Sequence, residues 1–445
     1  MFTPSRFVVV DDNERHLTAI LRIFQLIGSP CLGIRYEAET PLDSHHFRGV
    51  RVLFLDLHLL EGLAASDEAR HYGQITSILE DNIDAVGGPF VLVVWTRYPE
   101  LCNQLIAYLD DHIDAAKPQA RPLSIICLDK EKFINLVTGE IQKPEELRAA
   151  VEGAVSKNPQ LAAMLSWETD VLSAAGATLT ALIDLVPSAS RQTGTYPAAL
   201  DTQLSRLAVA AVGEKNVPND KRAALNAALT PILGDRIQNQ TVSAATKAIW
   251  DSALTKDQDP NLHNGLTNID AGRVNRMLHL ALPESETIRA KDWGAVVDFP
   301  GAWRTDEQMR ARYGSTLGEV IGSDFKVKPQ DSGRCRVRLV RVGAVCDHAQ
   351  GHTGPVPYLM GLEIPVDVKQ NTPSKAEWHS PVIVFAGNNE PFKLHVNSRQ
   401  LVTVTAAQTD EWAVQYRLRE QLLMDLIDHA AGYISRPGVV YIVKR

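Results

Sequence analysis

Three aspartates near the amino terminus are the residues whose types and spacing suggest chemistry. Asp11 and Asp12 follow the apolar run at residues 7–10, and Asp56 ends the apolar part of the stretch VRVLFLDLHLLEG at residues 50–62. Carboxylates that converge on one point repel each other, and a hard cation with oxygen ligands relieves this repulsion. Mg²⁺ suits such a site because it takes few protein carboxylates and keeps positions for water or phosphate. Taken singly, Asp11 would fit a helix N-cap and Asp56 a turn residue equally well.

Buried parallel strands would bring these aspartates together. Apolar runs of strand length lie at residues 7–12, 32–36, 50–56, 90–96 and 123–128, and helical patterns lie between them at residues 14–27, 68–86 and 101–113. Alternating strands and helices with short connections predict a doubly wound, five-stranded parallel sheet over residues 1–145. The carboxyl ends of such strands share one edge, which is where open α/β sheets bind their ligands. We therefore expect an α/β fold with the three carboxylates at that edge.

The order and separation of these aspartates resemble the receiver domain of two-component response regulators, which has a flavodoxin-like fold. The resemblance implies that Asp56 accepts a phosphoryl group from a sensor histidine kinase or a phosphotransfer protein. It also implies that Asp11, Asp12 and Asp56 hold Mg²⁺ together with the backbone carbonyl of His58. Such a domain catalyses only its own Mg²⁺-dependent phosphorylation and dephosphorylation, so an enzymatic activity on another substrate is not expected from it.

The receiver pattern requires two further groups. A hydroxyl at the end of the fourth strand binds the phosphoryl group, and Thr96 occupies that place. A lysine after the fifth strand pairs with the phosphoryl oxygens. Lys130 follows that strand directly and is preferred, while Lys143 in the sequence QKPEEL is the alternative.

Three positions depart from the receiver pattern. Leu60 stands where a proline is common, Arg97 follows Thr96 where a small residue is usual, and Cys127 occupies the position of the aromatic switch residue. The phosphorylation chemistry is therefore expected to be intact, whereas the usual output switch is in doubt. Arg97 is expected to restrict access to the site or to slow hydrolysis.

Length, charge and cysteine content indicate the number of domains, the classes of partner and the cellular compartment. The 445 residues suggest two or three domains, and the formal net charge of −8 argues against general binding to nucleic acid or membranes. The five cysteines are odd in number and form no CxxC motif, so neither a disulfide framework nor a zinc ribbon is expected. No signal peptide or apolar run long enough to cross a bilayer is apparent. These observations favour a cytoplasmic protein.

Two further regions follow the predicted receiver. Residues 146–325 are rich in alanine and leucine and predict an α-helical domain, in which Leu165, Leu172, Leu179 and Val186 recur every seven residues as a packing seam. Residues 326–445 predict a small α+β domain. Its expected elements are strands at 335–345, 356–368, 382–386, 391–396 and 401–405, a helix at 409–430 and a last strand at the carboxyl terminus.

Two clusters in the last region have residue types that could form a binding site. Cys346, Asp347, His348 and His352 have a spacing that would suit Zn²⁺, but a fourth strong ligand is missing, and a polar turn with a half-buried cysteine is favoured. Arg334, Arg336 and Arg338 are expected on one face of a strand. With Arg417, Arg419, Glu420 and Arg436 they would form either a recognition patch for phosphate, nucleic acid or an acidic partner, or a solvated, ion-paired face, which is favoured.

The order of a divergent receiver, a helical region and a tail containing CDHAQ, YRLRE and SRPG is similar to receiver proteins of bacterial phage-defence phosphorelays. We therefore expect a phosphorelay protein that acts through protein–protein contacts, for example with a partner response regulator, or as a phosphate sink. Two alternatives stay open. In the first, the carboxyl-terminal domain is an effector that acts on nucleic acid or nucleotide. In the second, the receiver is a scaffold that works without phosphorylation. The sequence leaves the oligomeric state open.

Overall fold

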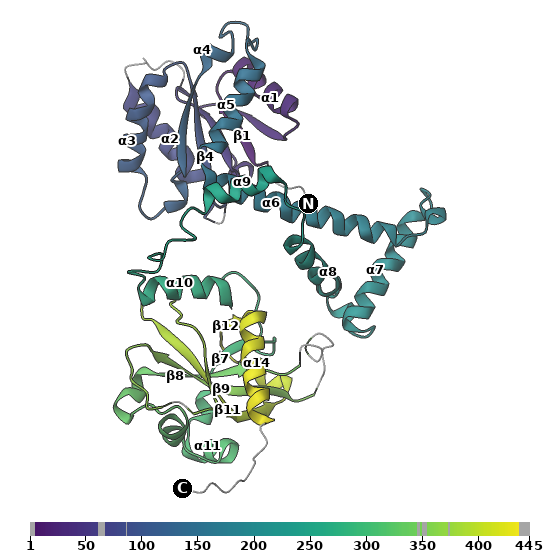
Figure 1. Ribbon diagram of the computed structural model, residues 1–445, viewed down its shortest axis with the longest axis vertical. Coiled ribbons are helices and arrows are strands. Elements are labelled where there is room, and N and C mark those ends of the chain that lie inside the picture. Colours follow the sequence, from purple (N-terminus) through teal and green to yellow (C-terminus); the bar gives the residue numbers. More distant parts are fainter. Residues whose placement is uncertain are drawn as a thin grey trace. The chain divides into compact units, whose positions relative to one another are not determined.

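The computed structural model describes residues 5–60, 67–85, 87–344, 348, 354–372 and 374–435. The chain forms two compact units, one of residues 1–175 with 237–258 and one of residues 176–236 with 259–445 (Figure 1). Each unit is described by itself. The sequence suggests domain boundaries near residues 145 and 325. These boundaries remain predictions.

A five-stranded sheet forms the centre of the first unit. Its strands have the order β2-β1-β3-β4-β5, and all neighbouring pairs are parallel. The central strand β3 has the sequence VLFLD, and all five of its side chains are buried. Each fully buried large apolar side chain contributes about 1.5–3 kcal/mol, so this strand anchors the sheet. The strands are β1 (Phe7–Asp11), β2 (Cys31–Arg35), β3 (Val52–Asp56), β4 (Val91–Thr96) and β5 (Ser124–Asp129).

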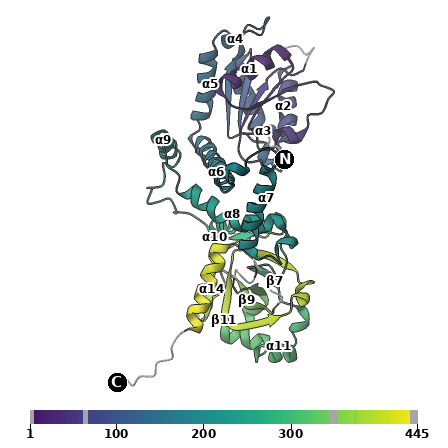
Figure 2. The same cartoon turned by 90° about the vertical axis from the view of Figure 1, so that its right-hand side faces the viewer.

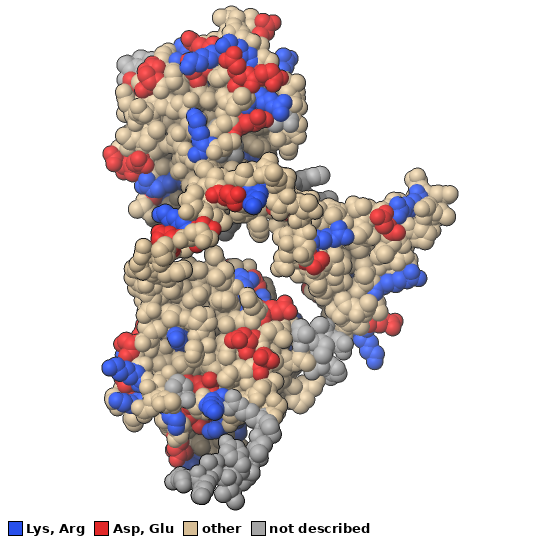
Figure 3. Space-filling view, in the orientation of Figure 1, with Lys and Arg blue, Asp and Glu red and all other residues tan. Residues whose placement is uncertain are grey.

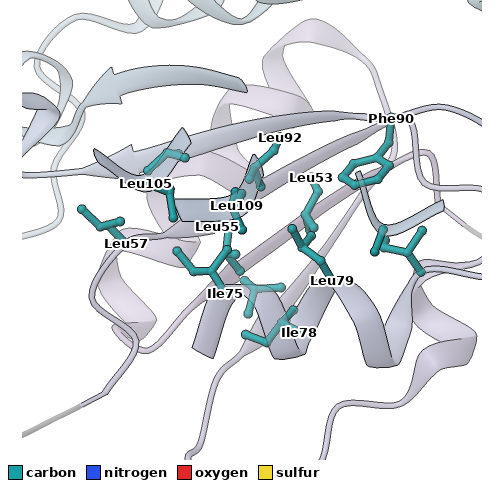
Figure 4. Close-up of a cluster of buried hydrophobic side chains, with 14 of the residues drawn as sticks. Leu53, Leu55, Leu57, Ile75, Ile78, Leu79, Phe90, Leu92, Leu105 and Leu109 are labelled. Carbon is teal, nitrogen blue, oxygen red and sulfur yellow. The ribbon is translucent and has the colours of Figure 1, made fainter. Parts of the chain in front are cut away.

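Helices cover both faces of this sheet. Helices α2 (Glu68–Asn82) and α3 (Cys102–His112) pack on one face, where Ile75, Leu79, Leu105 and Leu109 meet leucines of β3 and β4 (Figure 4). Helices α1 (Glu14–Ile27) and α5 (Pro144–Ser156) pack on the other face, and the short α4 (Lys130–Phe133) follows β5. The predicted doubly wound, flavodoxin-like α/β fold is thus confirmed, with strand and helix limits close to those expected.

The helical region that follows consists of long helices with few buried side chains. They are α6 (Pro159–Asp184), α7 (Tyr196–Val212), α8 (Lys221–Gln238), α9 (Ala244–Ala253) and α10 (Asn268–His279), and Figure 2 shows them in a second view. Only some residues of the predicted packing seam are buried. Val186 is fully buried and Leu165 is half-buried, but Leu172 and Leu179 are 56% and 58% exposed.

A seven-stranded sheet forms the centre of the carboxyl-terminal part, and every described pairing in it is antiparallel. Its order is β10-β11-β9-β8-β7-β12-β6. Helix α14 (Glu420–Ile434) packs on one face, and α11 (Asp306–Tyr313), α12 (Leu317–Glu319) and a π-helical turn at Val320–Asp324 lie toward the other. The strands are β6 (Leu280–Ala281), β7 (Ala295–Asp298), β8 (Arg336–Arg341), β9 (Val356–Pro365), β10 (Glu377–His379), β11 (Phe392–Val404) and β12 (Val414–Leu418).

This part confirms the predicted α+β class and corrects several of its elements. The sheet already begins at β6 and β7, within the region expected to be helical. The helix expected at 409–430 begins only at Glu420, because Val414–Leu418 is a strand whose Tyr416 and Leu418 enter the core beneath α14. Residues 391–396 and 401–405 join into one strand with an irregularity between Val396 and Leu401. The predicted last strand lies outside the described residues.

None of the described helices combines the length and the apolar character that crossing a membrane would require.

Candidate metal centre at the edge of the parallel sheet

The three aspartates of the sequence analysis meet at one edge of the first sheet. Asp11 is the last residue of β1 and Asp56 the last residue of β3, and these neighbouring strands are parallel. One carboxylate oxygen from each of Asp11, Asp12 and Asp56 lies within 4.8 Å of the others. Asp11 is fully buried, Asp56 is 8% exposed and Asp12 is half-buried. Among the described residues, no other group of three metal-ligating side chains converges in this way.

A tight strand-to-helix turn keeps the acidic pair at this edge. Asn13 is the N-cap of α1, and its side chain accepts hydrogen bonds from the backbone amides of Arg15 and His16. The backbone amide of Asn13 in turn donates to Asp11 Oδ1 at 2.9 Å. Because Asn13 caps the helix, Asp11 and Asp12 are not needed for that role. The N-cap interpretation of Asp11 is therefore wrong.

Lys130 is the cation that contacts the acidic cluster. Its Nζ donates to Asp11 Oδ2 at 2.8 Å and to Asp56 Oδ2 at 2.5 Å, and its side chain is 1% exposed. It begins α4, directly after β5, because Asp129 caps that short helix through the amide of Glu131. The alternative, Lys143, pairs instead with Glu146 on the exposed surface of α5. Of the two lysines considered, the structure brings Lys130 into the site.

Thr96 lies at the same edge of the sheet, but within the described part of the chain its hydroxyl forms no hydrogen bond with the three aspartates. It is the last residue of β4, and its neighbour Trp95 is in register with Asp56. The side chain is fully buried, and its Oγ1 accepts the backbone amide of Tyr98 at 3.1 Å. The strand order therefore places a hydroxyl, an ammonium and three carboxylates at one edge of the sheet.

Burial and like charge shape the electrostatics of this cluster. Burial, together with the charge of Asp56, raises the pKa of Asp11 to about 7 despite the nearby ammonium of Lys130. Burial and then Asp56 also raise the pKa of Asp12. Burial alone would lower the pKa of Lys130, but the carboxylates of Asp56 and Asp11 raise it overall. Three carboxylates facing one ammonium leave an excess of negative charge that a divalent cation would balance.

The donor set fits a hard cation. All three side chains offer oxygen, which is what Mg²⁺ and Ca²⁺ prefer. The backbone amide of His58 donates to Asp56 Oδ1 at 3.3 Å, so this loop stays close to the carboxylate. The cluster can therefore hold a metal ion, with Asp11, Asp12 and Asp56 as its side-chain ligands.

Histidine rings lie near the cluster, and the sequence analysis considered none of them, since it named His58 only for its backbone carbonyl. The His58 ring lies 4.5 Å from that of His71 and 4.9 Å from that of Tyr98, measured between ring centroids. His71 is 2% exposed, and neither of its ring nitrogens has a hydrogen-bond partner among the described residues. His16 Nδ1 lies 3.9 Å from Asp11 Oδ1. Burial lowers the pKa of all three histidines. Their spacing in the sequence carries no signal, because they come from the starts of two helices and from a loop.

The three residues that depart from the receiver pattern lie in different surroundings. Arg97 is exposed and donates to the Tyr98 hydroxyl at 3.0 Å, and Leu60 packs against the core beneath α2 and α3. Cys127 on β5 forms a disulfide with Cys102 at the start of α3, with the Cα atoms 6.4 Å apart. The sequence analysis expected no disulfide framework, and it did not anticipate this single bridge. The two cysteines lie 25 residues apart on different elements, so only the fold brings them together.

The arginines of the carboxyl-terminal sheet are paired with acids. Arg338 is 7% exposed and binds Glu363 through Nε at 2.8 Å and Nη2 at 2.9 Å, and it also contacts Asp298. The exposed Arg334 and Arg336 pair with acids as well. Their partners are Asp367 and Glu390, and Arg417 and Arg419 pair with Glu286. These contacts match the ion-paired face rather than a free recognition patch. Figure 3 shows charges of both signs interspersed over its visible face.

Of the four residues considered as zinc ligands, the structure describes only His348, so it does not test this site. His348 is half-buried, and burial lowers its pKa. Cys346, Asp347 and His352, like Arg436 of the arginine group, lie outside the described residues.

Comparisons of the chain with models of known protein families, with curated proteins and with solved structures found no match. The fold and the metal-binding geometry of this cluster therefore have to be interpreted from the chain itself.

Proposed function

We propose that the amino-terminal domain is a receiver that accepts a phosphoryl group on Asp56 from a sensor histidine kinase or a phosphotransfer protein. The observation that carries this proposal is the position of Lys130, which bridges Asp11 and Asp56 at the carboxyl edge of the parallel sheet. A structural ion pair would match one lysine with one acid. Here one lysine faces three carboxylates, with a buried threonine hydroxyl on the next strand. That combination suits a transferred phosphoryl group and its counterion.

In the proposed reaction an Asp56 carboxylate oxygen attacks the phosphorus of a phosphohistidine. The phosphorus–nitrogen bond breaks, its electron pair stays on the donor imidazole, and an acyl phosphate forms on Asp56. Mg²⁺, held by Asp11, Asp12, Asp56 and the His58 carbonyl, would neutralise charge on the transferring oxygens. The Lys130 ammonium, already 2.5 Å from Asp56 Oδ2, would pair with a phosphoryl oxygen. The Thr96 hydroxyl would donate to another.

Intact mass spectrometry tests this proposal directly. The purified protein is incubated with Mg²⁺ and a small phosphodonor such as acetyl phosphate, beside Asp56→Asn and the control Asp111→Asn, which changes an exposed aspartate of α3. We expect one added phosphoryl group on the wild type and on Asp111→Asn, none on Asp56→Asn, and none without Mg²⁺. If a competent kinase also leaves the wild type unmodified, the receiver activity is refuted and a phosphorylation-independent scaffold is favoured.

We further propose that the phosphorylated protein acts through protein–protein contacts or as a phosphate sink in a phosphorelay, in the setting of phage defence that the order of its regions resembles. The paired arginines of the carboxyl-terminal sheet support this choice over an effector acting on nucleic acid, because their charge is already balanced. A sink predicts that Asp56→Asn increases signalling by a partner regulator that shares the kinase. An unchanged partner response would exclude the sink.

A further inference from the structure

Two histidines face each other at the edge of the antiparallel sheet. Strand β10 is an edge strand of this sheet, and its His379 is in register with His395 of the neighbouring β11. Side chains that are opposite each other in an antiparallel pair lie on the same face, with Cβ atoms about 4.5–5.5 Å apart. The two imidazole rings are 5.7 Å apart, measured between ring centroids. His379 is exposed and His395 is 5% exposed, so the pair connects the interior of the domain with its surface.

Hydrogen bonds engage the same ring nitrogen in both histidines. His395 Nδ1 lies 2.7 Å from Glu377 Oε1, and His379 Nδ1 lies 3.3 Å from the backbone oxygen of Ser380. A carboxylate and a carbonyl oxygen are both acceptors, so Nδ1 carries the proton in each ring and Nε2 keeps its lone pair. Neither Nε2 atom forms a hydrogen bond within the described part of the chain. The pair therefore presents two imidazole nitrogens in the form that binds metal ions.

The carboxylate behind His395 is buried and firmly held. The side chain of Glu377 is fully enclosed, and its Oε1 also accepts the side-chain amide of Gln370 at 2.9 Å, which in turn donates to the backbone oxygen of Phe325 at 2.7 Å. Its other oxygen, Oε2, is enclosed and has no hydrogen-bond partner among the described residues. Buried negative charge that is incompletely paired is costly. A cation on Nε2 of His395 would polarise the ring and strengthen the N–H that it donates to Glu377, as in carboxylate–histidine–metal sites.

The separation of the rings suits one shared ion. Because bonds from Zn²⁺ to imidazole nitrogen are about 2.0–2.1 Å long and that nitrogen lies about 1.2 Å from the ring centre, two rings that share an ion have centroids about 5–6 Å apart. The observed 5.7 Å lies within this range. Imidazole nitrogen favours Zn²⁺, Cu²⁺ and Ni²⁺ over Mg²⁺ and Ca²⁺.

From these observations we infer that His379 and His395 bind a divalent transition-metal ion of the Zn²⁺ class through their Nε2 atoms, and that Glu377 is the positioning residue for His395. Two side-chain ligands leave the other coordination positions to water or to a further ligand. This site is separate from the carboxylate cluster of the first unit, because all its residues belong to the second unit. The inference therefore does not depend on phosphorylation of Asp56.

Calorimetric titration of the full chain with Zn²⁺ alone, in a buffer with excess Mg²⁺ to occupy the carboxylate cluster, tests the site. In a purely structural pair, His395 serves only Glu377, and His379 contributes nothing. We expect His379→Gln to weaken the binding of one Zn²⁺ ion at least about tenfold, since it removes one of two nitrogen ligands. The control His263→Gln makes the same change at another exposed histidine and should bind like the wild type. A wild type that binds no Zn²⁺, or identical titrations of all three proteins, overturns the inference.

Electron paramagnetic resonance of the Cu²⁺-loaded protein supplies a spectroscopic test of the ligands. The wild type and His263→Gln should show two imidazole nitrogens on the ion, and His379→Gln should show one. An unchanged number of nitrogens in His379→Gln contradicts the site.

The role of Glu377 requires a separate readout, because a buried residue also affects stability. Glu377→Gln should weaken Zn²⁺ binding about 10–100-fold while the Cu²⁺ spectrum still shows two nitrogens, since an orienting partner is lost and both ligands remain. If Glu377→Gln lowers the melting temperature but binds Zn²⁺ like the wild type, Glu377 is structural only and its positioning role is refuted.

Discussion

The two sheets of this protein both contain buried charge, but they balance it differently. In the parallel sheet, three carboxylates at the strand ends face a single ammonium, that of Lys130. In the antiparallel sheet, Arg338 lies in the middle of a sheet, with two oxygens of Glu363 and one of Asp298 around its guanidinium, and the Tyr416 hydroxyl donates to Glu363 at 2.9 Å. A buried charge that keeps its partners is tolerated inside a fold and becomes costly only when a partner is removed, whereas an excess of one sign marks a candidate ligand site.

Removing one member of the balanced cluster should have the largest effect. Glu363→Gln keeps the size of the side chain but leaves the buried guanidinium of Arg338 short of its main counter-charge. We expect the free energy of unfolding of the carboxyl-terminal domain to fall by about 3–5 kcal/mol. Urea unfolding followed by tryptophan fluorescence measures this.

The matched control for that experiment makes the same chemical change on the surface. Glu390 pairs with Arg334 and Arg336, and all three side chains are more than 40% exposed. Glu390→Gln should therefore cost no more than about 1 kcal/mol. Equal effects of the two substitutions would mean that the Arg338 cluster is no more important for stability than a solvated pair.

The unbalanced cluster should instead respond to pH and to cations. Burial raises the pKa of Asp11 from 3.8 to about 7, so between these values the folded state binds more protons at this site than the unfolded state. The contribution of Asp11 to stability is then fully present below about pH 4 and is lost as the pH rises to about 7. Without divalent cations, the amino-terminal domain should lose a few kcal/mol across this range.

Thermal melts at a series of pH values with a chelator, with Mg²⁺, and for Asp11→Asn measure this effect. Bound Mg²⁺ favours the ionised carboxylate and should raise the melting temperature most at neutral pH. Asp11→Asn should flatten the pH dependence and weaken the response to Mg²⁺. A wild type whose pH dependence matches that of Asp11→Asn would show that the excess charge of the cluster has no energetic consequence.

The sequence predicted well those elements whose structure depends on neighbouring residues, and poorly those that depend on contacts with distant parts of the chain. The strand carrying Asp56 was recognisable because VLFLD is buried on both faces, and strand order then brought Asp11 and Lys130 to it. Residues 409–430 were misassigned because Tyr416 and Leu423 fit a helical period as well as a strand followed by a helix. The choice between them depends on pairing of β12 with β7 and β6, which are more than 100 residues away in the sequence.

The Cys102–Cys127 disulfide allows the stability of the two sheets to be measured separately. It links α3 to β5 in the parallel-sheet unit, while the described cysteine of the carboxyl-terminal domain, Cys335, is free. Closing a loop of this length removes conformations from the unfolded chain and stabilises by about 3 kcal/mol. A reductant should therefore lower the melting temperature of the amino-terminal domain and leave the other transition in place, and a Cys102→Ser, Cys127→Ser variant should melt identically with and without it. Insensitivity of the wild type to reductant, together with five titratable thiols in the unfolded chain, would show that these cysteines are reduced and that apolar packing alone holds α3 on β5.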